Sequence, residues 1–202
     1  MPTMSRYPLP HYPLLTFPFL HYMESIDLKN AKMVEFGSGP SVVYWKKRCQ
    51  SIISYEPNKK IYDALQKESP QEAIQFISFA DLKKDKVKAS IAEADYILVD
   101  THPKDMKRFE LLEAIVPHTK NDVGIILDNT TWFLKAKDYL AKLFFVKEFP
   151  GFNKINELTA TSLYQTRKQL SFYQPTSLDE DGSLFAELLL PEEESKPWES
   201  KP

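Results

Sequence analysis

The chain has 202 residues, of which 43% are hydrophobic and 27% are charged, and its formal net charge is −2. This length suits one domain with a full-sized core, and the weak, dispersed charge does not indicate nucleic-acid binding. No apolar run approaches the roughly 20 residues of a membrane span, and the order of a signal peptide is lacking. Because Cys49 is the only cysteine, no internal disulfide can form, and we expect a cytoplasmic protein without membrane contact.

The first 30 residues are rich in proline and aromatic side chains, and residues 14–23 have the composition of a short apolar helix. We expect this N-terminal segment, residues 1–30, to form a lid over a binding site. The alternative is that it only covers an open face of a sheet. His11 and Tyr12 are candidate substrate contacts on the first interpretation.

Apolar runs then alternate with helical patterns, which is typical of parallel strands buried on both faces and joined by helices. The expected strands are 33–36, 51–55, 74–77, 96–99 and 123–127, and the expected helices are 41–48, 59–67, 104–116 and 132–143. Segments 144–148 and 159–165 add a hairpin-like pair. The pattern predicts a Rossmann-like, doubly wound α/β domain over residues 31–172, with a mostly parallel seven-stranded sheet and helices on both faces.

The last stretch, residues 173–202, differs from the rest in composition. Residues 175–202 carry eight acidic and two basic side chains, together with many prolines and serines. We expect an acidic, disordered tail, because such a segment buries too little apolar surface to fold. Its apolar part, residues 184–190, is a candidate contact for another protein or for this domain.

The most informative motif is the turn Glu-Phe-Gly-Ser-Gly at 35–39, between the first two expected strands. Gly37 and Gly39 allow a tight turn and leave no Cβ to obstruct a ligand. Glu56, at the end of the second strand, is placed to accept hydrogen bonds from a ribose diol. A dinucleotide site would need glycine where Val42 stands, so a ribose ligand without pyrophosphate, such as S-adenosylmethionine (SAM), fits better than NAD. The alternative is a turn that only joins a strand to a helix.

Together these features resemble class I SAM-dependent methyltransferases over about residues 7–167. The likeness is greatest to an uncharacterised group that opens with a Pro-Trp-Tyr-Thr-Tyr-Pro-like segment, here residues 9–18, and carries Asp-Asn after its fifth strand. Further shared stretches are residues 35–45, 99–101, 124–129 and 160–164.

The resemblance implies a cofactor site made of Glu35, Gly37, Ser38, Gly39, Glu56, Asp81 and Asp100. In that site the glycine turn lines the methionine and ribose part of SAM, and Glu56 holds the ribose hydroxyls. Asp81 would lie near the adenine edge. Aspartate suits a helix N-cap equally well, and this alternative stays open.

A second likeness concerns Asp100, Asp128 and Asn129, which are similar to the metal ligands of catechol and caffeoyl-CoA O-methyltransferases. Two carboxylates and an amide oxygen suit Mg²⁺ or another divalent cation. Such a metal would bind the acceptor and favour its alkoxide. In the alternative, Asp100 positions the cofactor amino group, while Asp128 and Asn129 cap the next helix or hydrogen-bond the loop.

The candidate catalytic residues are Asp100, His102 and Lys104. The metal-dependent enzymes carry a base lysine three residues after the aspartate, where this chain has Pro103, followed by Lys104. His102 is the alternative base, because its pKa normally lies near neutrality.

The sequence therefore predicts a SAM-dependent methyltransferase that acts on an oxygen of a small molecule or glycan. One alternative is a non-catalytic nucleoside-binding protein with the same fold, which makes protein contacts through its acidic tail. Another is an NAD-dependent oxidoreductase, against which Val42 counts. The sequence does not identify the acceptor.

Overall fold

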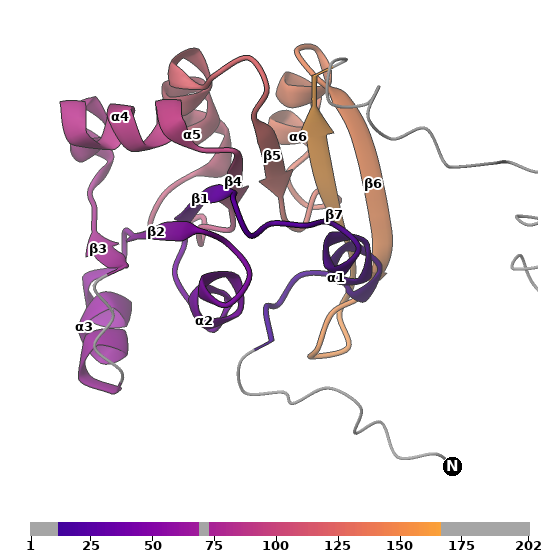
Figure 1. Cartoon of the computed structure of the whole chain (residues 1–202), viewed down its shortest axis with the longest axis horizontal. Helices are drawn as coiled ribbons and strands as arrows, with labels where there is room; N and C mark the ends of the chain where they lie inside the picture. The colour runs from indigo at the N-terminus through magenta and orange to yellow at the C-terminus, as the bar shows by residue number, and fades with distance from the viewer. Residues whose placement is uncertain (1–11, 69–72, 167–202) are drawn as a thin grey trace, which may run out of the picture.

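A computed structural model describes residues 12–68 and 73–166, and within them it contains one seven-stranded sheet of order β3-β2-β1-β4-β5-β7-β6 (Figure 1). The strands are β1 (Lys32–Phe36), β2 (Ser51–Glu56), β3 (Ile74–Phe76), β4 (Tyr96–Val99), β5 (Gly124–Leu127), β6 (Phe145–Phe152) and β7 (Leu158–Gln165). Strands β1 to β5 pair in parallel, whereas β7 runs antiparallel to both β5 and β6. The predicted Rossmann-like fold is confirmed. The tail 173–202 and His11 lie outside the described residues.

Helices cover both faces of this sheet, as the alternation predicted (Figure 1). They are α1 (Phe17–Glu24), α2 (Ser41–Lys46), α3 (Lys59–Glu68), α4 (Asp85–Glu93), α5 (Arg108–Ile115) and α6 (Leu134–Ala141), with short 3-10 turns η2 (Phe79–Lys83) and η3 (Val116–His118). Helices α4, α5 and α6 pack on one face, against side chains such as Ile97 and Ile125. Helices α1 and α2 pack on the other face, against Leu98 and Ile126. Among the described residues, no helix is long and apolar enough to cross a membrane.

The sequence did not predict α4. This helix offers the sheet only two large buried apolar side chains, Val87 and Ile91, and the rest of its surface is polar or small. A stripe that narrow hardly differs from the pattern of a polar loop. Two predicted helices also begin later than expected, at Arg108 and Leu134, because the residues before them form turns.

The described part of the N-terminal segment is fastened to the antiparallel side of the sheet. The backbone N–H of Thr16 donates to Thr161 Oγ1 at 3.0 Å, and Thr16 Oγ1 donates to the carbonyl of Phe149 at 2.8 Å. Helix α1 buries Phe19 and Met23 in the core beside them. This part of the segment therefore covers a face of the sheet, and Leu14 alongside it reaches the cavity described below.

The strand order reverses at β1, which lies between β2 and β4. The connection after β1 leads to β2 on one side and the connection after β4 leads to β5 on the other, so a crevice opens between the carboxyl ends of β1 and β4. The residues that follow β1, β2, β4 and β5 therefore converge on one edge of the sheet.

Candidate functional site

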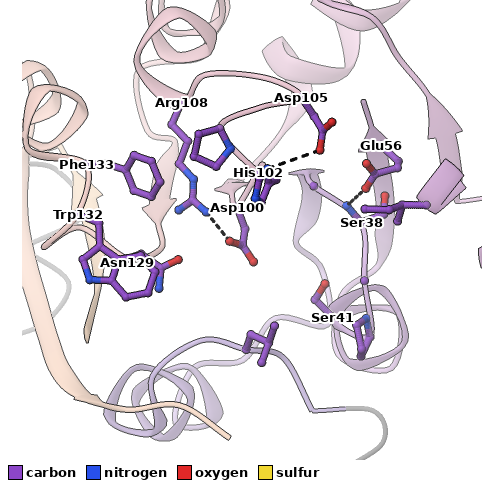
Figure 2. A pocket seen from close by; sticks show the side chains of 16 residues that line it. Ser38, Ser41, Glu56, Asp100, His102, Asp105, Arg108, Asn129, Trp132 and Phe133 are labelled. Atoms are coloured by element: carbon purple, nitrogen blue, oxygen red, sulfur yellow. Dashed lines mark hydrogen bonds and ion pairs between the residues drawn. The ribbon is translucent and has the colours of Figure 1, made fainter. Parts of the chain in front are cut away.

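A cavity of about 530 Å³ lies at this edge, which is a size suited to a small organic ligand (Figure 2). Its walls are residues 37–41 after β1, Glu56 and Ile61 after β2, Asp100, His102, Pro103, Asp105 and Arg108 after β4, Asn129, Trp132 and Phe133 after β5, and Leu14. Of the predicted site residues, seven line it: Gly37, Ser38, Gly39, Glu56, Asp100, His102 and Asn129. Four do not: Glu35, Asp81, Lys104 and Asp128.

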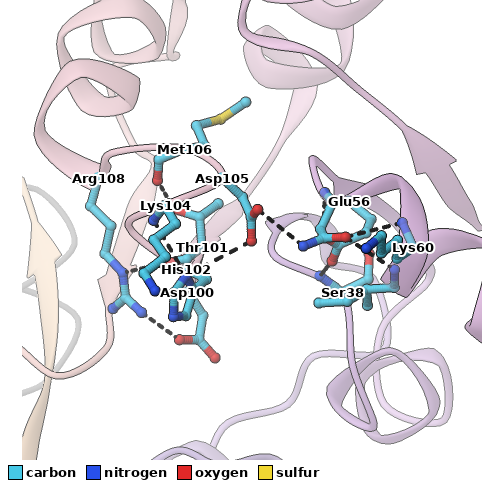
Figure 3. Close-up of polar contacts among 12 residues, drawn as sticks. Ser38, Glu56, Lys60, Asp100, Thr101, His102, Lys104, Asp105, Met106 and Arg108 are labelled. Atoms are coloured by element: carbon cyan, nitrogen blue, oxygen red, sulfur yellow. Dashed lines mark hydrogen bonds and ion pairs between the residues drawn. The ribbon is translucent and has the colours of Figure 1, made fainter.

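Glu56 ends β2 with only 3% of its surface exposed, and both of its carboxylate oxygens accept backbone hydrogen bonds. The N–H of Ser38 donates to Oε2 at 2.8 Å (Figures 2 and 3), and the N–H of Asn58 donates to Oε1 at 2.7 Å. Burial raises the pKa of Glu56, and these two N–H groups oppose the rise. Each oxygen keeps a lone pair for a further donor, so the pair suits a vicinal diol.

The two glycines of the turn differ in what surrounds them. Gly37 has φ +98°, and a Cβ built on it would lie 2.4 Å from the carbonyl oxygen of Asp100. A Cβ on Gly39 would meet only Ser41 Oγ, at 3.9 Å. The expectation that Gly37 serves ligand access is therefore incomplete, because its missing side chain first allows β1 to pack against the end of β4. Gly39 is the glycine whose Cβ position is open.

Glu35 lies behind the turn instead of in the cavity wall, and none of its surface is exposed. Its Oε2 accepts the hydroxyl hydrogen of Ser54 at 2.6 Å, and Ser54 Oγ lies 2.6 Å from Ser38 Oγ. Burial raises the pKa of Glu35 to about 8, against the lowering effect of the Ser41 and Ser54 hydroxyls. Two hydroxyl groups thus connect a buried carboxyl to the cavity.

Arg108, which the sequence reasoning missed, is the cation of this site. It is 4% exposed, and its Nη2 donates to Asp100 Oδ1 at 2.7 Å (Figures 2 and 3). Its Nε donates to the carbonyl of Thr101 at 2.9 Å, its Nη1 donates to the carbonyl of Asp128, and its guanidinium carbon lies 4.2 Å from the centre of the Phe133 ring. Burial raises the pKa of Asp100, and Arg108 opposes that rise. An arginine in the first turn of a helix normally reads as a solvated charge, so the sequence carried no signal for it.

The predicted metal ligands do not fit a divalent cation. Asp128 is 1% exposed, and its Oδ1 accepts the Thr161 hydroxyl at 2.6 Å, so this oxygen faces β7. Arg108 already supplies a positive charge between Asp100 and the backbone of Asp128. Burial raises the pKa of Asp128 to about 7, with Asp100 adding to the rise.

Asn129 takes the loop role that was the alternative to metal binding. It adopts φ +50°, which asparagine tolerates better than most residues, and its carbonyl accepts the backbone N–H of Trp132 at 2.8 Å. The resulting turn delays the start of α6 and brings Trp132 and Phe133 to the cavity (Figure 2).

The two candidate bases occupy different places. The side chain of His102 lines the cavity and is 61% exposed, and its Nδ1 accepts the backbone N–H of Lys104 at 3.3 Å. Lys104 instead lines a neighbouring hollow of about 340 Å³ together with Phe79 and Met106. His102 is therefore the candidate that faces the cavity.

Asp81 forms an N-terminal capping box for η2. Its Oδ2 accepts both the backbone N–H and the hydroxyl of Ser78 at 2.7 Å. The pKa of Asp81 is lowered, first by the partner Lys84 and then by the Ser78 bonds. Asp81 therefore supports the cap from the third position of η2, with Ser78 as the N-cap, and its adenine-edge role stays a prediction.

The similarity of this chain to known proteins lies in its three-dimensional structure. No protein-family model matches it, and no curated protein sequence matches it significantly. Among solved structures it is similar to the ribosomal protein L11 methylase of Lactobacillus delbrueckii subsp. bulgaricus (TM-score 0.53, 13% identity, 74% of this chain and 77% of that one). It is also similar to the O-methyltransferase TomG of Streptomyces achromogenes in complex with SAM (0.50, 11%, 74% and 78%). A third similar structure is a SAM-dependent methyltransferase of Aquifex aeolicus, with a TM-score of 0.50 and 11% identity over 75% of this chain and 89% of that one.

At these identities the likeness concerns the fold alone. The chain has the Rossmann-like fold of class I SAM-dependent methyltransferases, in agreement with the resemblance stated from its motifs. Its likeness to the group with the Pro-Trp-Tyr-Thr-Tyr-Pro-like segment stays a prediction.

Proposed function

We propose that this protein is a SAM-dependent methyltransferase that acts on an oxygen of a small molecule or glycan. The observation that carries the proposal is the pairing of Glu56 with the open turn at Gly39 on one side of a single cavity. A buried carboxylate with free lone pairs suits a ribose diol, and the open Gly39 position leaves room for a nucleoside beside it.

The pyrophosphate of NAD finds little support in this turn. Val42 occupies the place where a dinucleotide fingerprint has its third glycine, and it is 1% exposed in the core. The chain therefore presents a site for ribose without the close helix approach that a pyrophosphate uses. This favours SAM over a nicotinamide cofactor.

The other side of the cavity suits an acceptor with a flat ring. The side chain of Trp132 is 57% exposed at the cavity, with Phe133 and Arg108 beside it. An exposed indole binds the face of an aromatic or sugar ring. Methyl transfer needs in-line positioning above all, and His102 is available to take the hydroxyl proton. With Nδ1 accepting from Lys104, the neutral ring would carry its proton on Nε2, so His102 must release that backbone contact to act as the base.

Thermal unfolding with SAM, S-adenosylhomocysteine (SAH) and NAD tests the cofactor assignment. A ligand that binds only the folded state at about 100 times its Kd adds about 2.7 kcal/mol to the free energy of unfolding. We expect stabilisation by SAM and SAH and none by NAD. The reverse order would refute the proposal. Consumption of SAM in the presence of a panel of phenols, hydroxy acids and sugars then separates an enzyme from a non-catalytic nucleoside-binding protein.

A further inference from the structure

Glu35 is a buried carboxyl that does not line the cavity and is linked to it by two serines. None of its surface is exposed, and its Oε1 has no hydrogen-bond partner among the described residues. Its Oε2 accepts from the hydroxyl of Ser54, which in turn lies 2.6 Å from the hydroxyl of Ser38 at the cavity wall. A buried carboxyl with one orphaned oxygen is costly to keep, which points to a use.

The donor direction in the series of hydrogen bonds from Glu35 through Ser54 to Ser38 depends on whether Glu35 is protonated, because each serine hydroxyl has one hydrogen to donate. When Glu35 is ionised, Ser54 donates to it and Ser38 donates to Ser54, so the cavity meets the lone pairs of Ser38. When Glu35 is protonated it can donate to Ser54, Ser54 donates to Ser38, and Ser38 turns its hydrogen toward the cavity. The ionised form therefore suits a cationic ligand.

The charges around Glu35 act in the same sense. The charged groups that act on it are Asp100, at the end of β4, and Glu56, at the end of β2, and both are carboxyls. From α2 it is faced by the neutral hydroxyl of Ser41. Arg108, the cation that lines the cavity, is bound to Asp100. Without a ligand, burial above all keeps a proton on Glu35, and the repulsion from these two carboxyls adds to it; a positive ligand at the turn offsets that repulsion.

We propose that Glu35 is a positioning residue that acts through Ser54 and Ser38, so that the site binds a cationic SAM while releasing the Glu35 proton to solvent. The inference rests on the proposed function. It means that the cavity distinguishes the sulfonium of SAM from the neutral thioether of SAH, and that SAM is favoured more strongly as the pH rises toward 8. The pKa of about 8 for Glu35 agrees with a neutral carboxyl in the empty site at pH 7.

Calorimetric titration of the full chain with SAM at about pH 7, in two buffers of different ionisation enthalpy, measures the protons exchanged on binding. We expect release of up to about one proton per SAM, less for SAH, and a loss of this release in Glu35→Gln. Asp81→Asn is the control, because Asp81 lies outside the cavity wall and its lowered pKa keeps it ionised at pH 7, so the release should stay unchanged. Ser54→Ala breaks the chain of hydroxyls and should reduce the release.

The outcomes are distinct for the two proposals. SAM binding to the wild-type protein without proton exchange would overturn the role of Glu35 and leave the cofactor assignment intact, and this result needs no variant to fold. Full release in Ser54→Ala would overturn the role of the serines. Absence of SAM binding would overturn the cofactor assignment and this inference with it.

Discussion

Gly37 packs so closely against the end of β4 that a Cβ on it would lie 2.4 Å from the carbonyl oxygen of Asp100. The same residue adopts φ +98°, a backbone conformation that side-chain-bearing residues rarely adopt. Gly37 is therefore needed for folding, whereas the open Cβ position of Gly39 leaves space for a ligand.

We therefore expect opposite results from the two glycines. Gly37→Ala should lower the free energy of unfolding by about 2–5 kcal/mol, because it adds backbone strain and a clash. Gly39→Val should stay folded and lose SAH binding, because its side chain would occupy ligand space. Urea unfolding and calorimetry of both variants measure the two effects. A stable Gly37→Ala protein, or unimpaired SAH binding by Gly39→Val, would contradict this assignment.

The sequence predicted the strands and Glu56 correctly, because in these cases the local pattern alone indicates the role of the residues. Continuous apolar runs located the strands, and Glu56 was found because a carboxylate at the end of the second strand has a known geometric role. It was a poor guide where burial decides the role. From the sequence, Arg108 has the pattern of a surface charge, but in the fold α5 brings it to Asp100. Asp128 has the pattern of a metal ligand, but its carboxylate accepts a hydrogen bond from Thr161 of β7. Local sequence patterns do not predict such contacts between residues that are far apart in the chain.

Glu56→Ala should weaken SAH binding by about 1–3 kcal/mol, which corresponds to roughly 5- to 150-fold in Kd. The physical reason is the loss of charge-assisted bonds to the ribose hydroxyls. The unliganded melting temperature must be measured as well, because Glu56 also holds the backbone of Ser38 and Asn58. Asp81→Ala is the control: it should cost about 1 kcal/mol of stability through the lost cap and leave the SAH affinity unchanged. An equal loss of SAH affinity in both variants would indicate that Asp81 contributes to cofactor binding.

Arg108→Met should destabilise the protein by about 3–5 kcal/mol, because it removes the buried member of an ion pair and leaves the partly exposed carboxylate of Asp100 and two carbonyl groups without their donor. Arg108→Lys should recover only part of this loss, since an ammonium cannot reproduce three bonds in one plane. The neighbouring Lys107, whose side chain is 73% exposed, provides the control. Lys107→Met should change the free energy of unfolding by less than about 0.5 kcal/mol. If Arg108→Met proved as stable as Lys107→Met, the hydrogen bonds of Arg108 would not contribute to the stability of the fold.

Divalent cations should leave the melting temperature unchanged, with or without SAH. Arg108 already neutralises Asp100, and Asp128 is bound to Thr161, so the site offers Mg²⁺ too few free oxygen ligands. Titration of the protein with Mg²⁺, Ca²⁺ and Mn²⁺ in a thermal-shift assay measures this. A stabilisation by one of them that disappears in Asp100→Asn would restore the metal site that the sequence suggested.

Stability should fall as the pH rises from about 5 to 8, because two buried carboxyls hold protons in the folded state. The pKa is raised by burial from 4.5 to about 8 for Glu35 and from 3.8 to about 7 for Asp128. Between the unfolded and folded pKa of each group, the folded protein binds more protons than the unfolded chain. The free energy of unfolding therefore decreases by about 1.4 kcal/mol per pH unit for each group. The contribution of Asp128 levels off above pH 7 and that of Glu35 above pH 8.

Urea unfolding across this pH range measures the slope directly. Glu35→Gln should make it shallower by the share of one group, and its stability relative to the wild-type protein should improve as the pH rises. Asp128→Asn should act in the same way over a window that ends about one pH unit lower. A wild-type stability that rises from pH 5 to pH 8 would mean that both carboxyls are ionised in the folded protein. In that case the Glu35 proton would not be available for release when SAM binds.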